Sequence, residues 1–279
     1  MSLGSASVKS ILKPLLVVGG VGKGSGTGSA TSKLFARRGY DVALIARGKD
    51  ALNELSEEIN REGRGKATPF PTASYNPKDI QATFGDLTEF YRLPVSPQLK
   101  STSQPQPTTH ALRVALFNIG YPVFKSFLQT TDEDVKNSLE GNVQSAFAFS
   151  REVILRLREN EIEDRVEGHP STSIPTTSGK GTLIFTGATA SQRGNTMTSA
   201  FAAGKAANRV LSQSLAKEFG REGIHVVHAV IDGRIKTSSD SDFVGLSPES
   251  IAKAYWDVAH QERSAWTWEL DLRPADEQW

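Results

Sequence analysis

A glycine-rich stretch, GKGSGTG at residues 22–28, decides the fold of this chain. It follows the short apolar run Leu15 to Val18 and precedes a helical segment over residues 30–38, after which residues 41–46 form a second apolar run. This order is typical of a dinucleotide-binding βαβ unit, because small residues let the backbone approach a pyrophosphate and the helix N-terminus supplies N–H donors. We therefore predict a phosphate-binding turn, rather than a bare glycine turn, formed by Gly22, Lys23, Gly24, Ser25, Gly26, Thr27 and Gly28.

The rest of the chain continues the alternation of strands and helices. A helix is expected over residues 50–62, and apolar runs follow at residues 114–117, 183–185 and 226–231 with helical segments between them. Strands that are buried on both faces read as such unbroken apolar runs. The prediction is a single α/β domain over residues 15–279, with a Rossmann-type, doubly wound parallel sheet.

Three segments lack the apolar pattern of a core. Residues 1–14, of which the first ten are rich in Ser and Gly, are predicted to form a flexible tail. Residues 92–110 are rich in proline, and residues 159–180 run from acidic residues into HPSTSIPTTSGK. Because neither of these two segments can bury enough apolar surface, we interpret both as polar surface insertions, with a functional lid as the alternative.

The composition excludes several classes of function. With 32 basic and 31 acidic residues the formal charge is +1, which removes the electrostatic case for binding nucleic acid or an anionic membrane surface. No cysteine is present, so disulfides, thiolate nucleophiles and iron–sulfur clusters are excluded. No apolar run near the start is long enough for a membrane span or an export signal. We predict a cytoplasmic protein with a small-molecule substrate.

Several motifs in the same order resemble those of the short-chain dehydrogenase/reductase family. The family fingerprint TGxxxGxG matches the glycine turn with Val21 in place of Thr, and its NNAG motif is similar to FNIG at residues 117–120. Its YxxxK helix resembles FAAGK at residues 201–205, and its PGxxxT turn resembles DGRIKT at residues 232–237. The resemblance implies an oxidoreductase whose nicotinamide cofactor also contacts Asn118, Gly120, Lys205, Gly233 and Thr237.

The end of the second predicted strand bears on the choice of cofactor. An NAD-binding member of the family would be expected to carry an acidic residue there, and this chain has Ala46 followed by Arg47. A guanidinium can pair with a 2′-phosphate that a carboxylate would repel, and Lys23 can add a second charge. We therefore expect NADP rather than NAD; the alternative is that both residues are solvated surface charges. The family's adenine-contacting aspartate is replaced near Ala73.

The catalytic set that the resemblance implies is incomplete. In the family a tyrosine gives a proton to the substrate oxygen, a lysine holds the ribose and lowers the pKa of that tyrosine, a serine orients the substrate, and an asparagine supports a water relay. Lys205 and Asn142 match the lysine and the asparagine, whereas Phe201 and Ala188 replace the tyrosine and the serine and carry no hydroxyl. General acid–base assistance contributes about 10²–10⁴ in rate, so carbonyl reduction would be slow unless another group takes over.

Three nearby side chains are candidates to replace the lost hydroxyls. Thr189 follows Ala188, although neighbouring residues on a strand point to opposite faces. Tyr121 directly follows FNIG, and Asp232 stands where the family has proline, so both are expected near the nicotinamide. The alternatives are that Tyr121 packs on a strand end and that Asp232 caps a turn.

Two functions remain open from the sequence. The first is an NADP(H)-dependent oxidoreductase acting on a small organic carbonyl, alcohol or imine; an iminium would need hydride but no proton at the reacting atom. The second is an NADP(H)-binding protein without redox turnover, either a regulatory or scaffold subunit or a catalyst of non-redox chemistry. The glycine turn, Asn142 and Lys205 favour the first function, and the lost hydroxyls favour the second.

Histidines and tryptophans in the C-terminal third are expected to be structural. His225 and His228 are three residues apart in an apolar run, which predicts opposite faces of a strand and no shared metal. Trp256, Trp266 and Trp268 are expected to seal the edge of the sheet, with a place in a substrate pocket as the alternative.

An apolar stripe predicts self-association. Val135, Leu139, Val143 and Phe147 recur at helical spacing around the predicted asparagine helix. Because this helix often forms the subunit interface in the family, the resemblance implies a homodimer or homotetramer. The alternative is ordinary packing of the stripe on the sheet.

Overall fold

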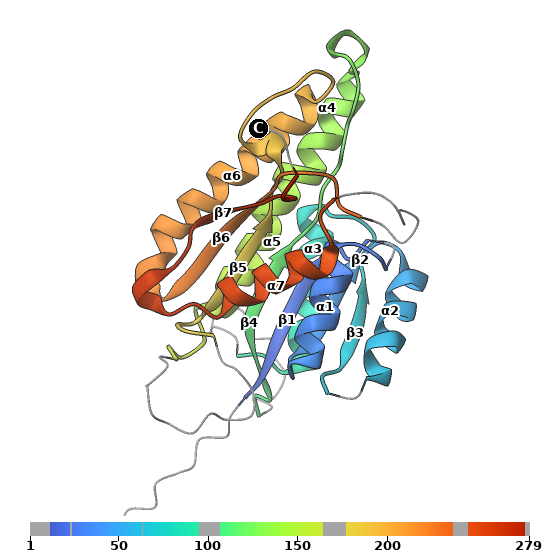
Figure 1. Cartoon of the computed structure of the whole chain (residues 1–279). Coiled ribbons are helices and arrows are strands. Elements are labelled where there is room, and N and C mark those ends of the chain that lie inside the picture. Colours follow the sequence, from blue (N-terminus) through green and yellow to red (C-terminus); the bar gives the residue numbers. More distant parts are fainter. Residues whose placement is uncertain are drawn as a thin grey trace, which may run out of the picture.

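The structure is a computed structural model that describes residues 12–22, 24–62, 64–94, 107–163, 177–236 and 245–276. Within these ranges seven parallel strands form one sheet in the order β3-β2-β1-β4-β5-β6-β7 (Figure 1). The strands are β1 (Lys13–Gly19), β2 (Asp41–Ala46), β3 (Ala67–Pro71), β4 (His110–Phe117), β5 (Gly181–Thr186), β6 (Ile224–Ile231) and β7 (Glu269–Leu272). The strand order reverses between β1 and β4, and open α/β sheets bind ligands outside the carboxyl ends of the strands at such a point.

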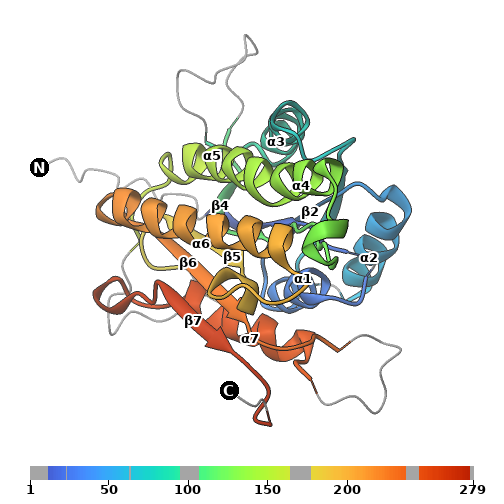
Figure 2. The ribbon, with the colours of Figure 1, turned by 90° about the horizontal axis from the view of Figure 1, so that it is seen from above.

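Helices cover both faces of the sheet (Figure 2). One face packs against α1 (Thr27–Arg37), α2 (Lys49–Arg61) and α7 (Pro248–Ala259), and the other against α3 (Pro77–Tyr91), α5 (Ser145–Leu157) and α6 (Ser199–Phe219). Between β4 and α5 lie α4 (Asp132–Ser138) and a π-helical turn (Leu139–Gln144). None of the helices in the described part of the chain is long and apolar enough to cross a membrane.

Side chains of β1 show how the sheet is buried on both sides. Leu15 and Val17 pack in the cluster beneath α3 and α5, whereas Leu16 and Val18 pack in the cluster beneath α1 and α7. Burying one such side chain fully contributes about 1.5–3 kcal/mol to the free energy of unfolding. This burial confirms the predicted Rossmann-type parallel sheet and explains its unbroken apolar strands.

Two predicted boundaries are corrected by the structure. β1 begins at Lys13, so the predicted tail of residues 1–14 is two residues too long. The backbone N–H of Lys13 donates to the carbonyl of Thr109 at 3.1 Å, and its ammonium lies 2.7 Å from the carboxylate of Asp41, which together hold it in the sheet. α1 begins at Thr27, three residues before the predicted start, because the glycine turn runs directly into the first helical turn.

Parts of the predicted tail and insertions fall outside the described residues. These parts are residues 1–11, 95–106 and 164–176. Both polar insertions therefore stay predictions.

Candidate active site

The glycine turn joins the end of β1 to the start of α1 at the point where the strand order reverses. Gly20, Gly22 and Gly24 have φ values of 91°, 72° and 93°, which side chains with a Cβ rarely adopt. A Cβ on Gly28 would lie 2.8 Å from the carbonyl oxygen of Gly20 and 3.0 Å from the Cα of Val21. Glycine is therefore required both for the path of the turn and for the close approach of the helix to the strand.

The space in front of the turn fits an anionic group. The space beside Gly22, Gly24 and Gly26 is open. Apart from the adjacent residues in the sequence, no described atom lies within 4 Å of a Cβ built on any of these glycines. Gly26 caps α1 without a side-chain hydrogen bond, and the buried hydroxyl of Thr27 has no partner among the described residues. Unpaired donors at a helix N-terminus suit the pyrophosphate of a dinucleotide. Lys23, predicted to help, lies outside the described residues.

Arg47 follows β2 at the same edge of the sheet. Its side chain is exposed, and its guanidinium carbon lies 5.1 Å from the ring centroid of Tyr75, in the loop after β3. Burial raises the pKa of Tyr75, and the charge of Arg47 partly offsets that rise. The ring therefore holds the guanidinium close to the strand end. Tyr75 was not anticipated from the sequence, because a single aromatic residue in a loop is a weak signal.

Two asparagines fix the segment that follows β4. Asn118 donates from its backbone N–H to the carbonyl of Gly19 at 2.8 Å and from Nδ2 to the carbonyl of Gly20 at 2.6 Å. Asn142, fully buried in the π-helical turn, accepts from the backbone N–H of Tyr121 and donates to its carbonyl, both at 3.1 Å. These bonds tie the end of β4 to the glycine turn on one side and to the π-helical turn before α5 on the other.

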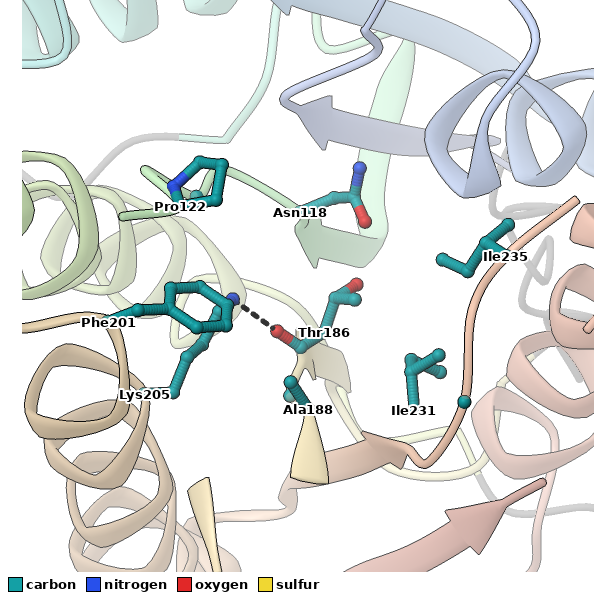
Figure 3. A pocket seen from close by; sticks show the side chains of 11 residues that line it. Asn118, Pro122, Thr186, Ala188, Phe201, Lys205, Ile231 and Ile235 are labelled. Carbon is teal, nitrogen blue, oxygen red and sulfur yellow. Dashed lines mark hydrogen bonds between the residues drawn. The ribbon is translucent and has the colours of Figure 1, made fainter. Parts of the chain in front are cut away.

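A cavity of about 360 Å³ opens at the carboxyl ends of β4, β5 and β6 (Figure 3). Its wall is mostly apolar, and it contains six of the residues predicted for the site. The lining residues are Asn118, Gly120, Pro122, Thr186, Gly187, Ala188, Phe201, Lys205, Ile231, Gly233 and Ile235. Thr237, the last cofactor contact that the resemblance implied, lies outside the described residues.

Lys205 is the one titratable side chain among the described residues that line the cavity. Its Nζ donates to the carbonyl of Thr186 at 3.0 Å and lies 5.9 Å from the ring centroid of Phe201, one helical turn earlier (Figure 3). Burial lowers the pKa of Lys205 to about 8. At neutral pH the cavity therefore holds one buried ammonium that has donors to offer a ligand.

The candidate replacements for the lost hydroxyls do not line the cavity. Ala188 and Phe201 form part of the wall, as their sequence positions predict. Thr189 instead donates its hydroxyl to the carboxylate of Asp232, which also lies 3.5 Å from the guanidinium of Arg273. Tyr121 is held through its backbone, with its Cβ against Gly141. Catalytic roles for Thr189, Tyr121 and Asp232 stay predictions that the cavity lining does not support.

The family model for short chain dehydrogenases matches residues 105–244, half of the chain. The chain belongs to the short-chain dehydrogenase family. A comparison with curated proteins found no match.

Solved structures support the same assignment. A short-chain dehydrogenase from Rhodopseudomonas palustris is 27% identical, with 94% of this chain and 98% of that chain covered and a TM-score of 0.69. An alcohol dehydrogenase from the archaeon Thermococcus sibiricus, complexed with 5-hydroxy-NADP, is 17% identical over 96% and 99% of the two chains, with a TM-score of 0.74. An NADH-dependent reductase complexed with NAD is 18% identical over 95% and 96%, with a TM-score of 0.69. At their lower identities, the last two show the shared fold.

This short-chain dehydrogenase has a polar cluster around the buried His228, behind the cavity, that sequence analysis missed. Nδ1 of His228 lies 2.9 Å from the carboxylate of Glu269, and Arg209 donates twice to that carboxylate at 2.6 and 2.8 Å. Nε2 of His228 faces Gly187 in the cavity wall, where a Cβ would collide with the imidazole. Burial lowers the pKa of His228. The cluster joins α6, β6 and β7, so only the strand register reveals it.

The other aromatic residues of this short-chain dehydrogenase support the sheet. His225 stacks on Trp266 with centroids 4.7 Å apart and bonds to the carbonyl of Thr267 at 2.8 Å, so its surroundings differ from those of His228, as predicted for opposite faces. Trp256 packs edge-on against the ring of Phe35 at 4.9 Å. No tryptophan of the described residues lines the cavity, so the cavity gives no support to the alternative of a tryptophan-lined substrate pocket.

The apolar stripe that runs from α4 through the π-helical turn into α5 faces outward. Val135, Leu139 and Phe147 are exposed, so the alternative that they pack on the sheet is wrong. Val143 is half-buried. Contact of this stripe with a second copy of the chain stays a prediction.

Proposed function

We propose that the chain is an NADP(H)-dependent oxidoreductase that transfers hydride to or from a small organic carbonyl, alcohol or imine, in a site without the family's proton donor. One observation carries this proposal. A glycine turn that fits a pyrophosphate and a cavity that contains Lys205 lie at the same edge of the sheet, joined by the bond from Asn118 to Gly20. A dinucleotide bound at the turn would extend its reactive end toward the cavity.

Different residues at this edge would bind different parts of the cofactor. The glycine turn and the first N–H groups of α1 would hold the pyrophosphate. One N–H of the Lys205 ammonium donates to the carbonyl of Thr186, and the others would donate to ribose hydroxyls. Arg47 would pair with the 2′-phosphate. Because the similar structures include both NADP and NAD complexes, the preference for NADP depends on Arg47.

The cavity wall favours a substrate that does not need a protein hydroxyl. The bound cofactor would supply hydride. Phe201, Ala188 and Ile231 would surround the reacting atom with apolar groups, and the ribose of the bound cofactor would engage the ammonium of Lys205. A carbonyl needs a proton as well as hydride, whereas an iminium needs hydride alone. Imine reduction is therefore the chemistry that these residues support with the fewest additional groups.

The second candidate is a cofactor-binding protein without redox turnover. It is favoured by the bond between Thr189 and Asp232, which engages both groups outside the cavity. In this case NADPH would bind with the same selectivity but would not be oxidised by any substrate.

Calorimetric titration with NADPH and with NADH tests the cofactor site. We expect micromolar binding of NADPH and at least about tenfold weaker binding of NADH, since one charge-assisted pair contributes about 1.5–3 kcal/mol. The Arg47→Ala variant should lose most of this difference. The Arg221→Ala variant, which alters an exposed arginine next to the amino end of β6, is the matched control and should retain it.

Equal affinity for the two cofactors would contradict the assignment of Arg47, and absence of binding would contradict both candidate functions. The oxidation of NADPH then separates the two functions. A cyclic imine such as 2-methyl-1-pyrroline should be reduced faster than cyclohexanone. Binding of NADPH without oxidation by imines, ketones or aldehydes would favour the protein without redox turnover.

A further inference from the structure

The apolar wall of the cavity continues outside it along an arm of the chain. The segment after β4 rises above the carboxyl edge of the sheet and turns back into α4 (Figure 1). At the base of this arm Pro122 lines the cavity. Two residues further on, the ring centroid of Phe124 lies 5.6 Å from that of Phe201, which is itself part of the cavity wall. Phe201 therefore has one surface toward the cavity and another against the arm.

A second segment meets the arm at the same place. The carbonyl of Met197, just before α6, accepts a hydrogen bond from the backbone N–H of Lys125 at 2.9 Å. Met197 has a φ of 63°, an unfavourable conformation for a residue other than glycine, asparagine or aspartate. Such strain persists where the surroundings impose it, and it is frequent at ligand sites. Here the bond from the arm holds the strained residue beside Phe124.

Both side chains are exposed although they are apolar. The exposed fraction is 61% for Phe124 and 54% for Met197, and Phe201 is half-buried. We propose that Phe124, Met197 and Phe201 form an apolar platform at the mouth of the cavity, which binds an aromatic or bulky aliphatic group of the substrate beside its reacting atom. This inference rests on the proposed function, because it extends the site at which hydride would be transferred.

The polar groups nearby favour an apolar substrate over a hydroxylated or anionic one. Lys205 is the one charged residue in the described lining, and the proposed cofactor would engage it. The other ammonium near the platform, that of Lys125, is bound to the carboxylate of Asp134 at 2.7 and 2.8 Å. A polyhydroxylated substrate would leave its hydroxyls without partners on the platform, which disfavours its binding.

The platform is fixed before any ligand arrives. Asp134 also accepts hydrogen bonds from the backbone N–H and the hydroxyl of Thr131, in a capping box at the start of α4. Together with the bond between Lys125 and Met197, these contacts hold the arm at both ends. A surface that is already ordered binds an apolar group without the entropic cost of ordering loops.

Ketone binding to the NADP⁺-loaded full-length protein tests the inference without turnover, because the oxidised cofactor cannot reduce a ketone. Calorimetry would compare 4-phenyl-2-butanone with hydroxyacetone. We expect the phenyl ketone to bind at least about tenfold more tightly, since burying a phenylethyl group removes on the order of 100 Å² of apolar surface from water. The Phe124→Ser variant should lose most of this preference. The Phe90→Ser variant, which alters a phenylalanine on α3 that is 60% exposed, should keep it.

The outcomes test the platform independently of cofactor binding. Equal binding of the two ketones, or an equal loss in the Phe124→Ser and Phe90→Ser variants, would overturn the platform while the bound NADP⁺ leaves the cofactor site intact. If NADP⁺ does not bind, the proposed function fails, and the same ketone titration on the free protein still measures the preference. If light scattering shows that the wild type is a dimer and the Phe124→Ser variant a monomer, a second copy covers this surface and the platform is not a substrate site.

Discussion

The turn between β1 and α1 and the segment from β5 to α6 lie along the same edge of the sheet, but they differ in what limits their residues. Gly20 and Gly28 are limited by backbone atoms, since a Cβ at either position would lie within 2.8 Å of another part of the chain. Ala188 and Phe201 instead form part of the cavity wall, and Phe201 also packs on the ring of Phe124. The glycine turn is therefore needed for the fold itself, whereas hydroxyls at positions 188 and 201 can be lost without disturbing it.

Lys205 belongs to the segment from β5 to α6, and its burial lowers the stability of the fold. Burial disfavours its charged form and lowers its pKa to about 8. Its Nζ donates to the carbonyl of Thr186, which offsets only part of this cost. In the proposed function, this buried ammonium would donate to the ribose of the cofactor. The comparison thus separates positions that the backbone restricts from a buried ammonium to which the proposed function assigns a cofactor.

The largest expected effect comes from restoring the missing hydroxyls. The double variant Ala188→Ser and Phe201→Tyr would place a tyrosine hydroxyl and a serine hydroxyl at the cavity wall, with Lys205 one turn away. We expect NADPH-dependent reduction of a ketone such as cyclohexanone to rise by about 10² or more, since positioned acid catalysis contributes about 10²–10⁴. Steady-state absorbance measures this rate. An unchanged rate, with NADPH binding intact, would mean that the segment from β5 to α6 lacks other catalytic groups besides the two hydroxyls.

The next largest effect is expected at the glycine turn between β1 and α1. In the Gly28→Ala variant the new Cβ would meet the carbonyl of Gly20 and the Cα of Val21, so α1 must move away from the strand. We expect NADPH affinity to fall by about 10- to 100-fold, which corresponds to about 1.4–2.8 kcal/mol. The matched control is Gly85→Ala on α3, where a Cβ meets no atom within 4 Å. That control should keep its affinity and gain about 1 kcal/mol in the free energy of unfolding, because alanine favours helix.

Sequence reasoning succeeded where the backbone determines the residue. The glycine turn, the alternation of strands and helices, and the facing of Phe201 and Lys205 depend on local spacing, which one sequence displays. Such features need no knowledge of which segments meet in space.

The rest of the site depends on contacts between distant segments. The cluster of His228, Glu269 and Arg209 forms only once β7 pairs with β6, and nothing in the sequence sets that register in advance. The engagement of Asp232 by Thr189 has the same origin, across 43 residues of chain. These pairings decide which titratable groups reach the cavity, so the sequence could name the candidate proton donors but could not choose among them.

The smallest expected effect is the cost of keeping Lys205 buried. The folded pKa of about 8 is below the ordinary value of 10.5, so the unfolded chain binds more protons between these two pH values and stability rises with pH across that window. The Lys205→Met variant removes the buried charge but leaves the carbonyl of Thr186 without its donor. We expect a net gain of about 1 kcal/mol in the free energy of unfolding at pH 7. Urea unfolding at a series of pH values measures it.

The sign of this difference should reverse as pH rises. Above pH 10.5 the amine is neutral in both states, so the wild type no longer bears the cost of a buried charge and keeps its bond to Thr186. The Lys205→Met variant should then be the less stable protein. The Lys217→Met variant, on an exposed position of the same helix, should show a difference from wild type that does not change with pH. If the gain in the free energy of unfolding for Lys205→Met is also independent of pH, better packing is responsible for it. Burial of the amine would then not destabilise the fold. In that case the retention of Lys205 would need no ligand to explain it, and the contrast between the two regions would reduce to the loss of the hydroxyls alone.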